Sequence, residues 1–459
     1  MASIGGKSCY KEDDELLHGP AKTSLLGDRA KKPSGDHYWA KYEARVWMVT
    51  LLVGTCFLYC ARSSLPICAA TISEQYRWNK RETGLALSSF FWGYCLTQVA
   101  GGHLSDKVGG ERVLLVSAVV WGFITLVTPV ATHATTSSLL LVSFLRFLMG
   151  LMQGVHFPAL SSIFARRFHE KERGFTCSFV GCGSQCGTLL IGGAGSLILD
   201  WYGWEYVFYF AGLLPLAWGY WVYTYMEKDK ERYVIFSDLG KTCSTSTHTS
   251  VPWKKLLMKP PILAVVIAQF CVASTAFTLF SWIPIFFKSR FPDSQGLVFN
   301  VVPWLTAIPA ALLSGRLTDH LIKIGHKPII IRKLMEVIGM GISSIFIYLL
   351  SKSTNFCQAM VFISVAVALQ TFNHSGLTVN IQDLAPSCSG FLFGVANTGG
   401  SVFGILWVYL SGYLLDITGS WDSMFHLIVA VNVLGLLIYL EFAKAERMDI
   451  ESSCNVQKV

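Results

Sequence analysis

Arginine and glutamine side chains inside an otherwise apolar stretch are the first candidates for chemistry in this chain. The stretch Leu139–Ala165 contains Arg146, Gln153 and His156, yet it is long enough to cross a bilayer, which takes roughly 20 apolar residues in a helix. An arginine at such a depth costs several kcal/mol unless it faces protein or water, which makes it a functional candidate. Arg146 and Gln153 lie about two helical turns apart and therefore on one face. This face is predicted to line a polar cavity; the alternative is an arginine that caps a neighbouring helix.

A second arginine, Arg62, is predicted deep in the first apolar stretch of the chain. No aspartate or glutamate is expected at mid-depth in any apolar stretch, because Glu336 and Asp383 fall near the cytosolic ends of theirs. Two buried cations without a countercharge require an anion, and a guanidinium group binds phosphate or carboxylate through two parallel hydrogen bonds. The substrate predicted from Arg62 and Arg146 is therefore an organic anion.

The composition identifies the class of protein that must position these residues. Of the 459 residues, 52% are hydrophobic and 14% are charged, whereas a soluble domain has about 25% charged residues. Apolar stretches recur along the whole chain, so a polytopic protein in a lipid bilayer is predicted. The formal net charge of +8 does not indicate a nucleic-acid partner, because the basic residues lie in the short loops between spans. Neither metal-ligand spacing nor a catalytic constellation is found, so neither a metal site nor an enzyme is expected.

Twelve spans are predicted, which makes the chain an all-α membrane protein with both termini in the cytosol. An excess of lysine and arginine in the tails and alternate loops supports this orientation. The spans lie near 46–70, 84–103, 112–131, 138–164, 175–199, 205–226, 262–287, 297–316, 328–350, 357–381, 391–412 and 423–443. The predicted parts are a disordered cytosolic tail (1–44), an N-terminal six-helix bundle (45–226), a cytosolic interdomain loop (227–256), a C-terminal six-helix bundle (257–443) and a cytosolic tail (444–459).

Two landmarks recur in the second half of the chain. Gly102–Asp106 (GHLSD) is matched by Gly315–Asp319 (GRLTD), and Trp204–Phe208 (WEYVF) is matched by Trp421–Phe425 (WDSMF). Because both pairs have nearly the same spacing along the chain, two parallel six-span repeats are predicted. In transporters of this architecture the repeats rock about a substrate site near the middle of the membrane.

The segment Gly102–Arg112, GHLSDKVGGER, resembles the loop signature of the major facilitator superfamily, G-x-L-x-D-[RK]-x-G-x-x-[RK]. This resemblance implies two six-helix bundles and a latch that closes the cytosolic side while the protein faces outward. A tight turn with solvated charges is the simpler interpretation of the same residues, and the latch would be built from such a turn. The gating residues that the resemblance implies are Asp106, Lys107, Arg112, Arg166, Arg316 and Asp319.

Further stretches narrow the family. SFFWGY at 89–94, the arginine-glycine-proline pattern of 146–158, and NIQDLAP at 380–386 resemble the solute carrier anion family that includes the vesicular glutamate transporters and sialin. LLVGTCFLYCARSSLPIC, LSSFFWGYCLTQVAGGHLSDKVGGE and GWEYVFYFAG resemble in particular its nucleotide-transporting members. The resemblance implies a transporter of ATP, ADP and GTP that loads secretory vesicles by alternating access. It also implies that the membrane potential drives uptake, that chloride is the activating ion, and that no cofactor is needed.

The chain departs from the glutamate-transporting relatives at three positions. It has Gln153 where they carry a glutamate, Leu87 where they carry a histidine, and Val272 where they carry an arginine. Loss of the glutamate removes the expected proton carrier. A tetra-anion that enters a lumen-positive vesicle gains about 9 kcal/mol from 100 mV, so the potential alone supports accumulation. These departures favour a nucleotide substrate over glutamate or sialic acid.

The resemblance assigns the phosphates of the substrate to Arg62 and Arg146. Aromatic faces can stack a base for about 1–3 kcal/mol, although most such residues in membrane helices are ordinary packing. His156 and His374 are interpreted as packing histidines, although either could titrate in an acidic lumen. The remaining candidates for contacts with the substrate are Tyr94, Gln153, Phe157, His374 and Asn380.

The N-terminal tail contains an acidic cluster followed by two leucines, represented by Glu12, Leu16 and Leu17. This pattern resembles the acidic dileucine signals that clathrin adaptors read, and it predicts sorting to secretory or synaptic vesicles and lysosome-related organelles. The protein is expected to be a monomer. The alternative within the family is a proton-coupled transporter of an acidic sugar or glutamate. An anion channel or a non-transporting membrane sensor is the alternative of a different class, and the paired loop signatures disfavour it because a latch in each half suits rocking.

Overall fold

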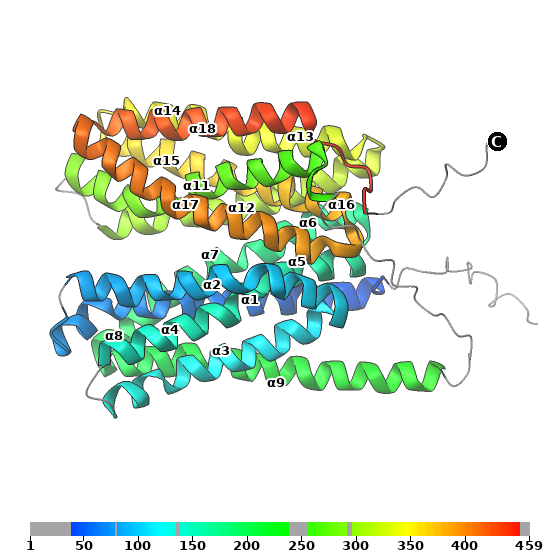
Figure 1. Ribbon diagram of the computed structural model, residues 1–459, viewed down its shortest axis with the longest axis horizontal. Coiled ribbons are helices and arrows are strands. Elements are labelled where there is room, and N and C mark those ends of the chain that lie inside the picture. The colour runs from blue at the N-terminus through cyan, green and yellow to red at the C-terminus, as the bar shows by residue number, and fades with distance from the viewer. Residues whose placement is uncertain (1–37, 79, 135–137, 238–255, 292–295, 450–459) are drawn as a thin grey trace, which may run out of the picture. The chain divides into compact units, whose positions relative to one another are not determined.

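The computed structural model describes residues 38–78, 80–134, 138–237, 256–291 and 296–449, and all elements within them are helices (Figure 1). Ten of the described helices are long and apolar enough to cross a membrane by length and composition. The described helices α2 (Lys80–Val108) and α9 (Trp204–Ser237) complete a set of twelve long segments. Helices are expected here because the bilayer core contains no water to hydrogen-bond backbone N–H and C=O groups, and a helix pairs these groups internally. The predicted all-α fold is confirmed, and the twelve long segments lie where the twelve spans were predicted.

The first six segments form the N-terminal half of the chain. Its remaining helices are α1 (Lys41–Gln75), α3 (Gly110–His133), α4 (Ser138–Gly154), α5 (His156–Arg167), α6 (Glu170–Gly181), α7 (Gly183–Leu190), η1 (Ile191–Gly195) and α8 (Ser196–Tyr202). The pair α4 and α5 forms one segment, and the run from α6 to α8 forms another. The chain remains helical to Ser237, beyond the predicted end of the sixth span at 226, because the sequence EKDKER that follows consists largely of good helix formers.

The last six segments form the C-terminal half. Its helices are α11 (Pro260–Arg290), α12 (Gly296–Ile324), α13 (Pro328–Glu336), η2 (Val337–Ile342), α14 (Ser343–Ser351), α15 (Phe356–Gln370), η3 (Thr371–His374), α16 (Leu377–Leu384), η4 (Pro386–Cys388), α17 (Ser389–Thr418) and α18 (Trp421–Phe442). The segment from α15 to α16 is broken by the 3₁₀ turn η3, whereas the run from α13 to α14 contains the π turn η2.

Each half has its own apolar core. Trp121, Trp204 and Phe208 are among the largest buried side chains of the N-terminal half, and Phe287 and Phe425 belong to a separate cluster in the C-terminal half. Many large apolar side chains on the outside are exposed in the chain alone, which suits a surface that faces lipid.

The helices α2 and α4 approach so closely that only glycine fits at their crossing. A Cβ atom added to Gly93 would lie 2.1 Å from the carbonyl oxygen of Phe147, and one added to Gly150 would lie 2.1 Å from that of Phe90. Small residues permit such backbone contact between membrane helices. This close approach brings α2 beside the helix that carries Arg146.

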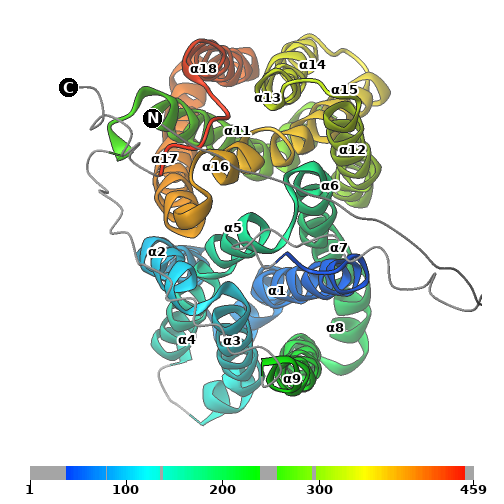
Figure 2. The same cartoon turned by 90° about the vertical axis from the view of Figure 1, so that its right-hand side faces the viewer.

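The two halves meet along α2 and α17, α5 and α17, and α6 and α12. Figure 2 views the bundles from the end where α5 and α6 lie against α16 and α17. Because α2 ends there and α17 begins there, we call this end of the molecule the latch end.

Candidate functional site

An aromatic cage surrounds the guanidinium group of Arg62. Its central carbon lies 4.7 Å from the ring centroid of Tyr59 and 4.9 Å from those of Phe90 and Tyr94. Such contacts between a cation and a ring face contribute about 0.5–2 kcal/mol each. The rings come from α1 and α2, so the close crossing of α2 and α4 helps to set the position of the cage.

One nitrogen of the Arg62 guanidinium is bonded and another, which is buried, has no hydrogen-bond partner among the described residues; we call the side of this second nitrogen the free edge. Its Nε donates a hydrogen bond to Oε1 of Gln153 over 3.2 Å, while Nη2 has no hydrogen-bond partner among the described residues. No carboxylate in the described part of the chain pairs with Arg62. Gln153 is fully buried and neutral, so it orients Arg62 without cancelling its charge. The free edge is therefore able to bind an anionic oxygen.

Arg146 lies behind this cage, against the backbone of α1. Its Nη2 donates to the carbonyl oxygen of Arg62 over 3.1 Å, and its Nη1 donates to that of Ala61 over 3.4 Å. Nη1 also lies 3.2 Å from the sulfur of Met149, and the side chain is only 3% exposed. The structure thus brings the two predicted arginines together, but Arg146 holds the helix that carries Arg62. Arg146 is thus a structural support of α1, as in the alternative, although it contacts carbonyl oxygens within α1 and does not cap the end of that helix.

The other predicted substrate contacts lie in different surroundings. Phe157 packs edge-on against Tyr59, with ring centroids 6.4 Å apart, and so borders the cage. His374, in η3, lies close to Gly181 of the other half. Asn380 donates to the hydroxyl oxygen of Tyr439 over 2.6 Å, and no described hydrogen bond joins it to the cage.

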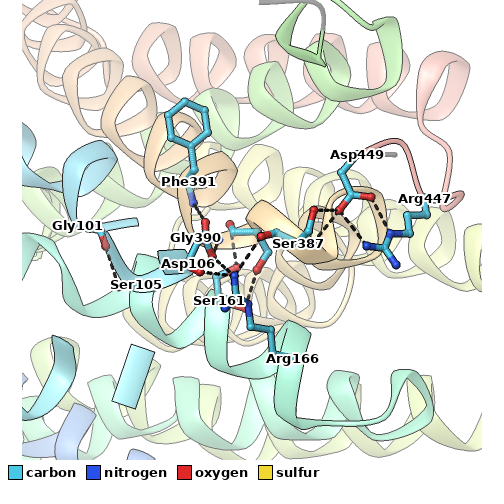
Figure 3. Close-up of polar contacts among 11 residues, drawn as sticks. Gly101, Ser105, Asp106, Ser161, Arg166, Ser387, Gly390, Phe391, Arg447 and Asp449 are labelled. Carbon is cyan, nitrogen blue, oxygen red and sulfur yellow. Dashed lines mark hydrogen bonds and ion pairs between the residues drawn. The ribbon is translucent and has the colours of Figure 1, made fainter. Parts of the chain in front are cut away.

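The carboxylate of Asp106 holds the first turn of α17 at the latch end (Figure 3). It accepts hydrogen bonds from the backbone N–H groups of Gly390 over 3.2 Å and Phe391 over 2.8 Å. A carboxylate is stabilised at a helix N-terminus, where backbone N–H groups lack partners within the helix. Arg166 donates to the carbonyl oxygens of Asp106 and Ser387, so it joins the end of α5 to α2 and to η4, the turn that leads into α17.

A similar contact occurs in the second half. Asp319 accepts the N–H of Phe175 over 3.1 Å, and the guanidinium of Arg316 lies 5.5 Å from the ring centroid of Phe175. Both aspartates of the repeated loop motif therefore reach across to the other half. Lys107 and Arg112 are exposed, and no described hydrogen bond or ion pair joins either of them to these contacts.

The chain was compared with protein-family models and with solved structures. The family model described as the Major Facilitator Superfamily matches residues 51–408. The chain belongs to the major facilitator superfamily. Among solved structures, the proton:xylose symporter XylE aligns with a TM-score of 0.71 at 14% identity, over 88% of this chain and 97% of that one. The E. coli fucose:proton symporter FucP aligns with a TM-score of 0.64 at 14% identity, over 87% and 99%. At these identities the two structures support the fold alone.

Sequence relatives place this superfamily member in solute carrier family 17. The chain is 52% identical to the human protein named voltage-gated purine nucleotide uniporter SLC17A9, over 93% of this chain and 98% of that protein. It is 32% identical to the chloroplastic ascorbate transporter of Arabidopsis thaliana, over 90% and 77%, and 29% identical to human sialin, over 81% and 77%. The predicted resemblance to the anion-transporting family is confirmed, and the chain is a multi-pass membrane protein whose named relatives are transporters.

A buried ion cluster between the halves was missed by sequence reasoning. Asp383, on α16, lies 3.5 Å from Nη1 of Arg173 on α6 and 3.0 Å from Nε of Arg332 on α13. Arg173 is 2% and Arg332 is 1% exposed, so neither is a solvated topology charge. The only indication of this cluster in the sequence was Asp383 within the 380–386 motif. Its partners, Arg173 and Arg332, come from helices far away in the sequence.

The segment that follows α18 returns to the latch end (Figure 3). The carboxylate of Asp449 accepts a hydrogen bond from the backbone N–H of Ser387 over 2.8 Å and another from its hydroxyl group. Burial raises the pKa of Asp449, but hydrogen bonds from Arg447 and Ser387 outweigh this effect and hold it below its ordinary value. The carboxylate is therefore ionised at neutral pH, and its stabilising contribution is lost only as the pH falls through that lowered pKa.

Replacing Asp106 by alanine should loosen the latch. The substitution leaves the N–H groups of Gly390 and Phe391 without their carboxylate, and hydrogen bonds to charged groups contribute about 1.5–3 kcal/mol each. We expect initial uptake to fall about tenfold or more. We also expect Cys388, now 1% exposed, to react faster with an impermeant maleimide, and Cys388→Ser identifies the adduct. Unchanged labelling of D106A would contradict a latch at this position.

Proposed function

We propose that this protein is a nucleotide transporter that carries ATP, ADP and GTP into secretory vesicles by alternating access. The observation that carries the proposal is the caged guanidinium of Arg62, which has a free edge, aromatic neighbours and no countercharge among the described residues. An oligophosphate supplies the missing negative charge, and a base supplies a flat face for Tyr59, Tyr94 or Phe157. The human, mouse and rat relatives at 51–52% identity, named as purine nucleotide uniporters, favour this substrate over other anions.

The proposed driving force is the membrane potential. Gln153 occupies the position where an acidic residue would neutralise Arg62 and carry a proton. A tetra-anion gains about 9 kcal/mol from a lumen-positive potential of 100 mV, which suffices for strong accumulation without a proton carrier. Chloride is proposed as the activating ion, and no cofactor is proposed.

The latch end is proposed to face the cytosol, because the loops at this end hold most of the basic residues. Both termini then lie in the cytosol, and the closed latch corresponds to a conformation open toward the lumen. The proposed sorting signal of Glu12, Leu16 and Leu17 lies outside the described residues. We propose that a clathrin adaptor reads it and directs a monomeric transporter to secretory or synaptic vesicles and lysosome-related organelles.

The proposal is tested by uptake into liposomes that contain the purified protein. Labelled ATP is supplied outside at an inside-positive potential, with chloride present and no pH gradient, and labelled glutamate serves as the control substrate. Saturable ATP uptake that disappears when the potential is collapsed supports the proposal. Flux of glutamate or an acidic sugar under a pH gradient, without ATP uptake, would contradict it, and unsaturable flux would favour a channel.

Glu336 provides a test of the proton-coupled alternative. This carboxyl group is fully buried; Oε1 accepts the N–H of Leu377 over 2.7 Å, and Oε2 has no partner among the described residues. Glutamine keeps the acceptor, so E336Q should transport ATP within about twofold of the wild type. Alanine leaves the N–H unpaired and should cost about 1–3 kcal/mol of stability, seen as a lower melting temperature. Loss of uptake by E336Q at unchanged stability would instead identify Glu336 as a proton carrier.

A further inference from the structure

A polar contact between the two halves lies beside the Arg62 cage. Asn397, on α17, donates hydrogen bonds from Nδ2 to the hydroxyl oxygen of Tyr94 over 3.2 Å and to Oε1 of Gln98. Tyr94 and Gln98 lie one turn apart on α2, and they are 6% and 0% exposed. Because Tyr94 and Gln98 are buried, their polar atoms are costly to leave unpaired, so this contact holds the two helices in one register.

The same tyrosine forms one wall of the cage. Its ring centroid lies 4.9 Å from the guanidinium carbon of Arg62, while its hydroxyl group contacts Asn397. The attraction between ring and guanidinium depends on the positive charge of the arginine. An anion bound to the free edge of Arg62 therefore weakens the hold on this ring at the point where the C-terminal half is attached.

The contact continues from the cage to the latch along α2 and α17. About one turn from Asn397 toward the latch end, a Cβ atom added to Gly394 of α17 would lie 2.5 Å from the carbonyl oxygen of Gln98. One turn further, a Cβ atom added to Gly102 would lie 2.1 Å from the carbonyl oxygen of Gly390. The next turn of α2 brings Asp106 to the N–H groups at the start of α17. The backbones are in direct contact over this distance, so a shift of α17 at Asn397 moves the latch as well.

We propose that Asn397 is a positioning residue that couples anion occupancy at Arg62 to release of the latch. In the empty site, Arg62 holds Tyr94, and Tyr94 holds α17 through Asn397. Anion binding frees Tyr94 and lets α17 separate from α2, which opens the latch end. The inference deepens the proposed function and rests on it, since it assumes that an anionic substrate binds Arg62.

The test combines three readouts on Asn397→Ala in liposomes and in detergent. We expect the maximal rate of ATP uptake to fall about tenfold, while the Kd for ATP stays within about threefold of the wild type. We expect ATP to accelerate maleimide labelling of Cys388 in the wild type but not in N397A. The matched control is Ser411→Ala, on the same helix, where the buried hydroxyl group bonds only to the carbonyl oxygen of Val408 in the described structure and should leave all three readouts unchanged.

Tyr94→Phe removes the hydroxyl group and keeps the ring, so it provides a second route to the same loss if N397A does not fold. The two substitutions should change the same readouts in the same direction, Y94F by less because Asn397 still bonds to Gln98, and the double variant should be no worse than N397A alone. Additive effects, an increase in Kd that matches the fall in rate, or ATP-accelerated labelling in N397A would each overturn the coupling. If the wild type itself neither binds nor transports ATP, the proposed function fails first, which the wild-type measurement reveals on its own.

Discussion

Replacing Arg62 by alanine is expected to abolish nucleotide uptake, with a fall of at least about a hundredfold. The reason is that Arg62 is the caged cation with a free donor edge, and each hydrogen bond between charged partners contributes about 1.5–3 kcal/mol. Loss of two such bonds to a phosphate corresponds to at least two powers of ten in affinity. Initial uptake rates in liposomes and ATP binding to the detergent-solubilised protein measure this effect.

Arg62→Lys is the matched control for this variant. It keeps the charge but loses the planar fork that binds two oxygens at once, so we expect uptake between that of R62A and the wild type. R62A should fold, because the half-buried side chain makes one described hydrogen bond and leaves no buried charge behind. Wild-type affinity for ATP in a folded R62A protein would remove Arg62 from the substrate site.

Replacing Arg146 by alanine is expected to abolish uptake and also to lower stability. The side chain is 3% exposed and donates to the carbonyl oxygens of Ala61 and Arg62, so alanine leaves a cavity and releases α1 at the residue that binds the anion. Truncation of a large buried side chain costs about 2–5 kcal/mol. Thermal unfolding in detergent, with uptake measured in parallel, tests this prediction.

Arg146→Leu separates the two effects of this substitution. Leucine fills part of the cavity but makes no hydrogen bonds, so it should recover part of the stability without recovering uptake. If R146A unfolds at the wild-type temperature and has lost only its affinity for ATP, Arg146 is a phosphate ligand, and the support that it gives to α1 is secondary.

Much of the fold could be predicted from the sequence, because the bilayer imposes a simple length rule on apolar helices. The correspondence of Asp106 and Asp319 was predictable for a similar reason, since a repeated motif marks equivalent positions of the two halves. The expected turn was wrong at these residues, because the motif lies in the last turns of α2 and α12. The face shared by Arg146 and Gln153 also followed from helical spacing. What that face contacts did not follow, because spacing gives no rotation of α4 relative to α1.

The parts that escaped prediction depend on contacts between distant helices. The cage around Arg62 takes Phe90 and Tyr94 from α2, and their positions depend on how closely α2 crosses α4. Nothing in the sequence around Asn397 indicates its role, because a single amide among small residues is typical of ordinary helix packing. Its role becomes visible only when its partners on α2 are known. Arg173 and Arg332 look like topology charges in the sequence, yet both lie buried beside Asp383.

The measurement that tests the central claim most directly is nucleotide accumulation as a function of an imposed potential in liposomes. At about 30 mV inside positive, without magnesium or a pH gradient, uniport of a tetra-anion gains about 2.8 kcal/mol, which corresponds to roughly hundredfold accumulation. A mono-anion gains only about 0.7 kcal/mol, or roughly threefold. We predict that ATP follows the first relation and that R62A shows no accumulation. Accumulation that ignores the potential and follows a pH gradient would contradict a potential-driven nucleotide transporter.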